Sequence, residues 1–440
     1  MSYRADLILN WDIYEEHLDE AAFFWGRWER SLSAPDEVLP EVVASEERLL
    51  ARLDALVLGG DAVAERLLLP ALASDEPERL ASAAFALLCD GSSRRGRDAV
   101  LTALEDASPA VLTVLQRALE LLDTAALPPW LMPVLLQRQI PLRALALDVL
   151  GAHAIPPELA LADLLVEGEP RVSAAALRAA ARLRVRLEPR VLQRFFSSSE
   201  STVRDAALVV GLLQGQRDAW VFCRRVVEAR GRDLETPLLL LALGGDAGEL
   251  DLLQGLLEVE ALRPDVLWAL GFGGRVSGAE ACLELFGDER VGHLAAEAFC
   301  AITGLVLEGQ YVSGEQPQTG EETAPEEPSS PLRHPEPGPG LPRAEVGAVR
   351  AWWTESRSRF NAHTRYLRGR PWTPAVLLQG LWTEPMRRRH VLALEAAFRS
   401  QGAVQLRTRT FARHQLAALE LLRTAAPFLS SGPLVTRLSA

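Results

Sequence analysis

The chain has 440 residues, of which 48% are hydrophobic and 24% charged, so it can form two or three folded units and is too apolar to be disordered throughout. The net charge of −13 is uneven, with about +11 over residues 341–440 and about −24 over the rest. All 46 basic residues are arginine, which excludes chemistry that requires a lysine, such as a Schiff base.

Targeting signals and paired cysteines are not apparent in the sequence. The N-terminus lacks a basic stretch followed by a long apolar run, and no later stretch reaches the roughly 18 apolar residues of a membrane span. We therefore expect a cytoplasmic protein without membrane insertion. The cysteines are far apart and none forms a CxxC pair, so they are predicted to be reduced core thiols; they are Cys89, Cys223, Cys282 and Cys300.

Residues 1–60 predict an N-terminal helical cap. The stretch 17–31 is amphipathic and rich in aromatic residues. Ser45 is expected to be the N-cap of a second helix, and Gly59 with Gly60 is expected to end it. This pair of helices would cover the apolar end of the repeats that follow.

Residues 61–308 predict repeats of about 31 residues, each made of two short helices. Proline stands two residues before several of the repeated anchor positions, where it fits the first turn of a helix. The Ala-rich faces would let neighbouring helices approach closely. The anchors are Leu80, Val111, Leu142, Val172, Val203, Leu234, Val266 and Val291, and the prolines are Pro109, Pro170 and Pro264.

The pattern resembles the HEAT-repeat family, whose second helix opens with Val-Arg-x-Ala-Ala after an Asp or Pro turn. STVRDAA (residues 201–207) and EPRVSAA (residues 169–175) fit that opening best. The resemblance implies an all-α, HEAT-like α-solenoid, which is a right-handed superhelix of antiparallel helix pairs, with the N-terminal cap and a C-terminal helical domain added.

Residues 309–342 predict a flexible linker, because residues 312–342 contain eight prolines and a cluster of glutamates. Residues 343–440 then predict a C-terminal helical domain rich in Arg and Trp. Thr373 and Pro374 are expected to begin one helix, and the amphipathic stretch from Met386 is expected to end near Gly402.

No motif in the chain predicts catalysis, a cofactor or a metal. The glycines of residues 271–278 lack the spacing of a dinucleotide loop and are interpreted as a turn between helices. The seven histidines are dispersed, and no cysteine has the neighbours of an activated nucleophile. His363, His390 and His414 could converge, although we favour coincidence.

The Arg/aromatic residues of the C-terminal region are the candidate partner-binding surface, because Arg and Trp are common in protein interfaces and on nucleic-acid-binding surfaces. For the arginines, contact with the acidic repeats of the same chain or with an acidic partner is favoured over nucleic acid, since the negative remainder of the chain would repel a phosphate backbone. Trp352 and Trp353 are expected to be partly core residues. The candidates are Trp352, Trp353, Arg357, Arg365, Tyr366, Arg368, Arg370, Trp372, Arg387, Arg388 and Arg389.

Five stretches together resemble one uncharacterised HEAT-repeat family whose genes often lie beside type VI secretion clusters in proteobacteria. They are HLDEAAFFW (17–25), ERLLARLDAL (47–56), LAAEAFCAITGL (294–305), FNAHTRYLRG (360–369) and RRHVLALEAAF (388–398). The resemblance implies an accessory or scaffolding part in that secretion apparatus and carries no catalytic residues.

The favoured function is therefore a non-enzymatic scaffold that binds other proteins. The alternative is a nucleic-acid-binding HEAT-like protein that uses the basic C-terminal domain. A HEAT-like lyase, which attaches pigments to cysteines of other proteins, is a weaker alternative that rests on fold analogy alone.

Overall fold

The computed structural model describes residues 9–90, 94–314 and 341–438, and these are almost entirely helical. The predicted all-α, solenoid-like class is confirmed, whereas the HEAT assignment and the right-handed superhelix stay predictions. The chain forms two compact units. Unit 1 contains Met1–Leu32, Leu39–Leu187 and Arg409–Leu416, and unit 2 contains Ser33–Val38, Glu188–Thr408 and Ala417–Ala440.

Unit 1 is built from helices, most of which are short. They are α1 (Trp11–Ser31), α2 (Leu39–Leu58), α3 (Gly60–Val63), η2 (Ala64–Leu68), α4 (Leu69–Ala71), α5 (Pro77–Cys89), α6 (Arg94–Glu105), α7 (Pro109–Leu121), α8 (Leu131–Leu136), α9 (Ile140–Ala152), α10 (Leu161–Val166) and α11 (Pro170–Leu183).

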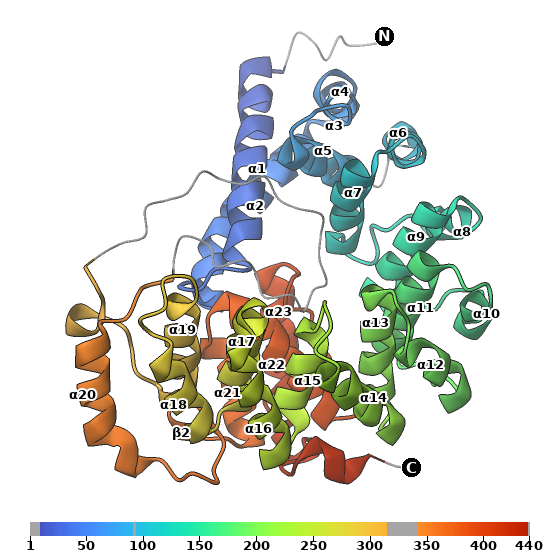
Figure 1. Ribbon diagram of the computed structural model, residues 1–440. Helices are drawn as coiled ribbons and strands as arrows, with labels where there is room; N and C mark the ends of the chain where they lie inside the picture. The colour runs from blue at the N-terminus through green and yellow to red at the C-terminus, as the bar shows by residue number, and fades with distance from the viewer. Residues whose placement is uncertain (1–8, 91–93, 315–340, 439–440) are drawn as a thin grey trace, which may run out of the picture. The chain divides into compact units, whose positions relative to one another are not determined.

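The anchored helices of unit 1 form a row, because α5 packs on α7, α7 on α9, and α9 on α11 (Figure 1). The intervening helices back this row, with α8 on α9 and α10 on α11. Close approach in the row depends on small residues: a Cβ added to Gly151 of α9 would lie 3.1 Å from the Cα of Ala179 in α11. At the start of the row, α1 and α2 pack on each other and on α5.

Helix starts in unit 1 follow the local sequence at most of the predicted positions. Pro109 and Pro170 occupy the first turns of α7 and α11, as predicted. The prediction for Ser45 is wrong, because α2 already begins at Leu39. The Ser45 hydroxyl lies inside the helix and donates to the carbonyl of Val42 at 2.9 Å, a bond that serine can make in place of capping.

Unit 2 continues the same alternation and then adds the C-terminal helices. Its elements are α12 (Pro189–Phe196), α13 (Ser201–Leu213), α14 (Arg217–Glu228), α15 (Glu235–Gly244), α16 (Ala247–Gly255), η3 (Leu256–Glu258), η4 (Glu260–Leu262), α17 (Arg263–Gly273), α18 (Val276–Glu284), α19 (Gly292–Thr303), η5 (Gly309–Tyr311), α20 (Val346–Ser356), η6 (Arg357–Arg359), β1 (Tyr366–Leu367), β2 (Arg370–Pro371), α21 (Pro374–Thr383), α22 (Met386–Arg399), η7 (Ala426–Phe428) and η8 (Leu434–Arg437). The first turns of α23 (Ala412–Leu422) belong to unit 1.

A second row of helices runs through unit 2, where α13 packs on α15, α15 on α17, and α17 on α19 (Figure 1). Helices α12, α14, α16 and α18 back this row. Gly271 and Gly273 lie inside α17, so the predicted turn is confined to Gly274, whose φ is +69°, and Arg275.

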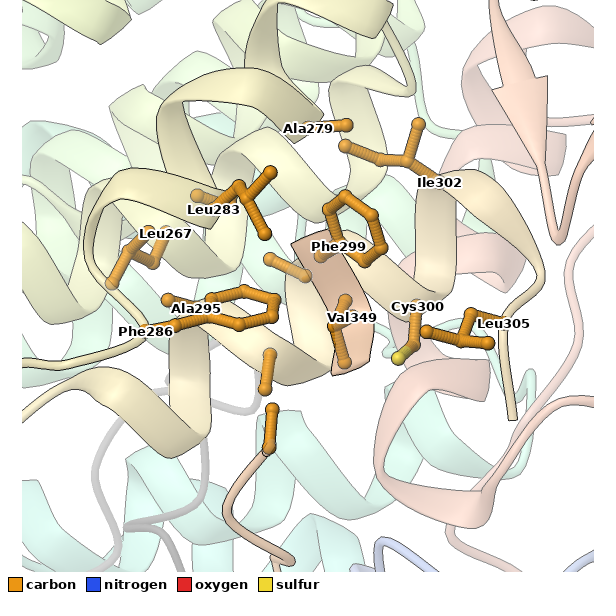
Figure 2. Packing of buried hydrophobic residues seen from close by; sticks show 14 of the residues in the cluster. Leu267, Ala279, Leu283, Phe286, Ala295, Phe299, Cys300, Ile302, Leu305 and Val349 are labelled. Carbon is orange, nitrogen blue, oxygen red and sulfur yellow. The ribbon is translucent and has the colours of Figure 1, made fainter. Parts of the chain in front are cut away.

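The C-terminal region shares a hydrophobic core with the last repeats. Val349 of α20 enters the cluster formed by α18 and α19 around Phe299 and Phe286 (Figure 2). Trp353 of α20 belongs to the same cluster. This corrects the prediction that residues 343–440 form a domain of their own, because one core contains residues from 341–366 together with residues from 267–305.

Most of the predicted linker lies outside the described residues, but both of its flanks are described. The amide of Ser313 donates to the carbonyl of Arg343 at 2.9 Å, and the amide of Glu345 donates to that of Tyr311 at 2.8 Å. The two described flanks of this segment therefore lie side by side within unit 2.

Candidate partner-binding surface

The tryptophan pair of the candidate set belongs largely to the core. Trp353 is buried, and its ring centroid lies 5.3 Å from those of Phe299 and Phe360. Trp352 is half-buried and lies 6.2 Å from Phe299. Both residues match the expectation of a partly internal role.

The short hairpin formed by β1 and β2 covers the C-terminal ends of α17 and α19. The amide of Tyr366 donates to the carbonyl of Gly274 at 2.7 Å, and the amide of Arg368 donates to that of Ala301 at 2.8 Å. The last carbonyls of a helix have no partner within the helix and carry partial negative charge. The hairpin supplies the missing donors.

Glycine is required where this hairpin meets α19. Gly304 has a φ of +78°, and a Cβ added there would lie 2.6 Å from the carbonyl oxygen of Arg368. Any other residue would be both strained and too close to the hairpin backbone. This contact fixes the position of the arginines on either side of the turn.

Three consecutive arginines at the start of α22 are enclosed within unit 2. Arg387, Arg388 and Arg389 are 1%, 2% and 0% exposed. Arg388 donates to the carbonyl of Gly271 at 3.1 Å, and its guanidinium lies 4.0 Å from the ring centre of Phe272. These contacts place a cation at the C-terminal end of α17, where it is stabilised by the helix dipole and by the aromatic ring.

The two neighbouring arginines have different partners. Arg387 pairs with Glu297 of α19, with 3.2 Å between Nε and Oε1, and its guanidinium lies 4.9 Å from the ring centre of Trp268. Arg389 donates from Nε to the carbonyl of Leu381 at 2.6 Å. Burial lowers the pKa of Arg387 and Arg388, and it lowers the pKa of Arg389 to about 10.

A buried carboxylate near the end of α22 joins two further arginines. Glu395 is 0% exposed and accepts from Arg399 at 2.7 Å and from Arg365 at 2.9 Å. Burial alone would raise the pKa of Glu395, but Arg365 and Arg399 outweigh it and hold the pKa below its usual value. The guanidinium groups lie 5.0 Å (Arg365) and 4.0 Å (Arg399) from the ring centre of Trp372.

Arg365 and Arg399 also bind helix ends. Arg365 donates to the carbonyl of Phe272 in α17 at 2.8 Å, and Arg399 donates to that of Leu243 in α15 at 3.4 Å. Together with the hairpin and Arg388, these contacts cap α15, α17 and α19 from one C-terminal segment.

The segment between α1 and α2 contributes to the same part of unit 2. The first two amides of α22 donate to carbonyls of this segment. The amide of Met386 donates to Glu37 at 2.9 Å, and that of Arg387 donates to Ala34 at 3.2 Å. These amides would otherwise lack partners, because they precede the first complete helical turn.

Exposure therefore divides the candidate set and corrects the expectation of one continuous surface. Arg370 is exposed; Trp352, Arg357, Arg365, Arg368 and Trp372 are half-buried; Trp353, Tyr366, Arg387, Arg388 and Arg389 are buried. Buried guanidinium groups are held by this chain's own carbonyls, carboxylates and rings, so they are not available to a partner in this fold. Arg370 and the half-buried members stay candidates for partner contact, and the exposed Arg359 adjoins them.

Sequence reasoning missed a second polar site, which lies in unit 1 around Glu46. This residue is 2% exposed, and its carboxylate accepts from Nε1 of Trp28 at 3.0 Å, from the amide of Arg413 at 3.1 Å and from the amide of Ala412. Burial raises the pKa of Glu46, against the opposing effect of these hydrogen bonds. Glu46 thereby caps the start of α23.

The ring of Phe411 fills the space beside this carboxylate. Phe411 is 0% exposed, and its ring centroid lies 4.9 Å from that of Trp28 and 5.8 Å from that of Phe85. More than 360 residues separate Glu46 from α23 in the sequence, so no local spacing could have paired them. The weak signal was a glutamate within an apolar helix face.

No protein-family model matches this chain, and no curated protein is significantly similar to it. Among the residues that the structure describes, no group of His, Cys, Asp and Glu side chains is arranged to hold a metal ion. Within the same residues, no helix is long and apolar enough to cross a membrane.

Proposed function

We propose that this protein is a non-enzymatic scaffold that binds other proteins in the cytoplasm. The observation that carries the proposal is the pair of helix rows, α5–α7–α9–α11 in unit 1 and α13–α15–α17–α19 in unit 2. Stacked helices of this kind present extended surfaces on which partners dock without a cofactor.

The partner that we propose is a component of a bacterial type VI secretion apparatus. The support is the resemblance of residues 17–25, 47–56, 294–305, 360–369 and 388–398 to the family encoded beside such clusters. Unit 2 offers Arg357, Arg359 and Arg370 as the remaining accessible cations of the candidate set and its neighbourhood.

Nucleic-acid binding is the less favoured alternative. Non-specific binding to a phosphate backbone depends on accessible arginines, and each one that is neutralised adds to the salt dependence. Three of the seven arginines of the expected basic surface, Arg387, Arg388 and Arg389, are enclosed. This leaves a smaller basic surface on a chain of net charge −13.

The test is an affinity purification from the native host with the full chain as bait. The variant carries Arg357→Glu, Arg359→Glu and Arg370→Glu. The control carries Arg94→Glu, Arg95→Glu and Arg290→Glu, whose wild-type side chains are 94%, 70% and 79% exposed. The proposal predicts a specific protein that the wild type and the control retain and the variant loses. A wild-type chain that retains no specific protein would contradict the scaffold function.

A further inference from the structure

Unit 1 holds residues 409–416 in the way that a receptor holds a peptide. These residues belong to unit 1, although the chain before them, up to Thr408, and the chain after them, from Ala417, belong to unit 2. The bound stretch is short, and its contacts are concentrated on a few side chains of α1, α2, α5 and the segment after α7.

The first contact is an aromatic box for one side chain. Phe411 is fully enclosed, with Trp28 and Phe85 as its nearest rings. Trp25 supports Phe85 at 5.9 Å in an edge-on arrangement. A box of this kind accepts a flat ring and gains both apolar burial and edge-to-face contacts.

The second contact is between the Glu46 carboxylate and the first backbone amides of a helix. Both oxygens of the buried Glu46 carboxylate are used, with Oε2 accepting from Ala412 and Oε1 accepting from Arg413 at 3.1 Å. Trp28 orients the carboxylate through its indole N–H at 3.0 Å. Charge-assisted bonds from free helix amides are strong and require no particular side chain on those residues.

The third contact is between Asp123 and the basic side chains that follow Phe411 in the sequence. Asp123 accepts from Nε2 of His414 at 3.0 Å and lies 3.5 Å from Nη2 of Arg413. Asp123 is 59% exposed, so this contact lies at the rim of the site. Charged contacts at a rim contribute more to specificity and association rate than to affinity.

We propose that this site in unit 1 recognises a partner protein through a helix start that carries phenylalanine followed by basic residues at the second and third positions after it. Residues 409–416 of the chain are the intramolecular occupant, and a partner binds by displacing them. The inference deepens the proposed scaffold function, on which it rests, by naming one docking site and the chemistry of its ligand.

The probe is a labelled peptide with the sequence of residues 406–424, titrated into the full chain and followed by fluorescence anisotropy. Because the internal segment competes, we expect binding to the wild type to be at least about tenfold weaker than binding to a chain carrying Arg413→Glu. Arg413 is 49% exposed, and its guanidinium lies 5.6 Å from the ring centre of Phe411, so the substitution removes its contacts with this ring and with Asp123 and loosens the segment without removing Phe411.

A charge exchange provides the matched control. The chain carrying Arg413→Glu and Asp123→Arg is expected to lose affinity for the wild-type peptide and to regain it for a peptide with Arg413→Asp and His414→Asp. A peptide with Phe411→Ala is expected to bind neither chain. Circular dichroism checks that every variant is folded.

Three results overturn the inference. They are the absence of saturable binding to any folded variant, equal binding of the Phe411→Ala peptide, and a wild-type dimer in light scattering formed by exchange of residues 409–416 between two copies. The titration needs no native partner, so it can succeed or fail independently of the affinity purification that tests the scaffold function.

Discussion

Buried arginine is the residue-scale feature that distinguishes this protein. A charged group inside a protein is costly unless hydrogen bonds and opposite charges compensate for its lost hydration. Here the compensation comes from the C-terminal carbonyls of α15 and α17 and from Glu297, Glu384 and Glu395. The arginines therefore position the C-terminal segment on the helix ends.

Removing one of these arginines should destabilise the protein strongly. Arg388→Ala leaves the carbonyl of Gly271 and the buried Glu384 without this cation, and we expect a loss of about 3–5 kcal/mol in the free energy of unfolding. Arg359→Ala is the control, because Arg359 is exposed and should change this free energy by about 0.5 kcal/mol or less. Urea unfolding measures both, and equal losses would contradict the assigned role of Arg388.

Asp205 gives the protein a specific pH dependence. Burial raises its pKa from 3.8 to about 6, against the opposing effect of Arg204, whose Nε donates to it at 2.8 Å. Because the folded state favours the protonated form, the stability that this group contributes is complete below about pH 4 and is lost as the pH rises through about 6, by roughly 3 kcal/mol.

The measurement compares wild type with Asp205→Asn by urea unfolding from pH 4 to pH 8. The asparagine keeps an oxygen acceptor for Arg204 and does not titrate. We expect the wild type to lose stability relative to the variant across this range. Parallel stability curves for the two proteins would show that Asp205 titrates at its ordinary pKa.

The residue scale was the least predictable from sequence. Arginine is mostly exposed in proteins, so the run from Arg387 to Arg389 indicated a surface. Its burial depends on carbonyls at the ends of helices more than a hundred residues earlier, and no local pattern encodes that contact. The burial of the cysteines was easier to predict, because each lies in an apolar stretch of the sequence. In the structure Cys223, Cys282 and Cys300 are buried and Cys89 is partly buried.

Among the elements, α22 shows how an amphipathic pattern can mislead. Its sequence begins with three arginines followed by mostly apolar residues, which predicted that the arginines face solvent. In the structure the arginine face meets α17 and α19, so nearly the whole helix is buried. Its end was predictable, because Gly402 has a φ of +79° and its amide donates to the carbonyl of Ala397 at 2.7 Å.

Local capping was read correctly where the cap is a short-range interaction. The Thr373 hydroxyl accepts from the amide of Val376 at 3.2 Å, and Pro374 follows in the first turn of α21, as predicted. The prediction of an N-cap at Ser45 was wrong because the apolar pattern of α2 extends to Leu39. Burial of Leu39 and Val42 outweighed the local preference of serine for a cap position.

The docking of α20 depends on Trp353 more than on its neighbour. Trp353→Ala empties a site between Phe299 and Phe360 and should cost about 3–5 kcal/mol in the free energy of unfolding. Trp352→Ala is the matched control, because the half-buried Trp352 should cost clearly less. Urea unfolding followed by circular dichroism ranks the two variants, and the reverse order would contradict this packing.

For the whole molecule, composition and a period of about 31 residues were enough to predict an all-α chain of stacked helices. The division into units was not predictable in this way. It falls between Leu187 and Glu188, inside the repeat region, and each unit includes a segment that is remote in sequence. Ser33–Val38 joins unit 2 through backbone hydrogen bonds, and Arg409–Leu416 joins unit 1 through amides that donate to the Glu46 carboxylate. Composition reveals neither contact.

The central claim is that the arginines of α22 lie in the interior of unit 2, so that partner binding falls to accessible residues such as Arg359 and Arg370. Hydrogen–deuterium exchange of the full chain tests this claim most directly. We expect the amides of α22 from His390 to Arg399 to be among the slowest to exchange, and those of the largely exposed α6 to be much faster. Exchange in α22 as fast as in α6 would contradict the claim.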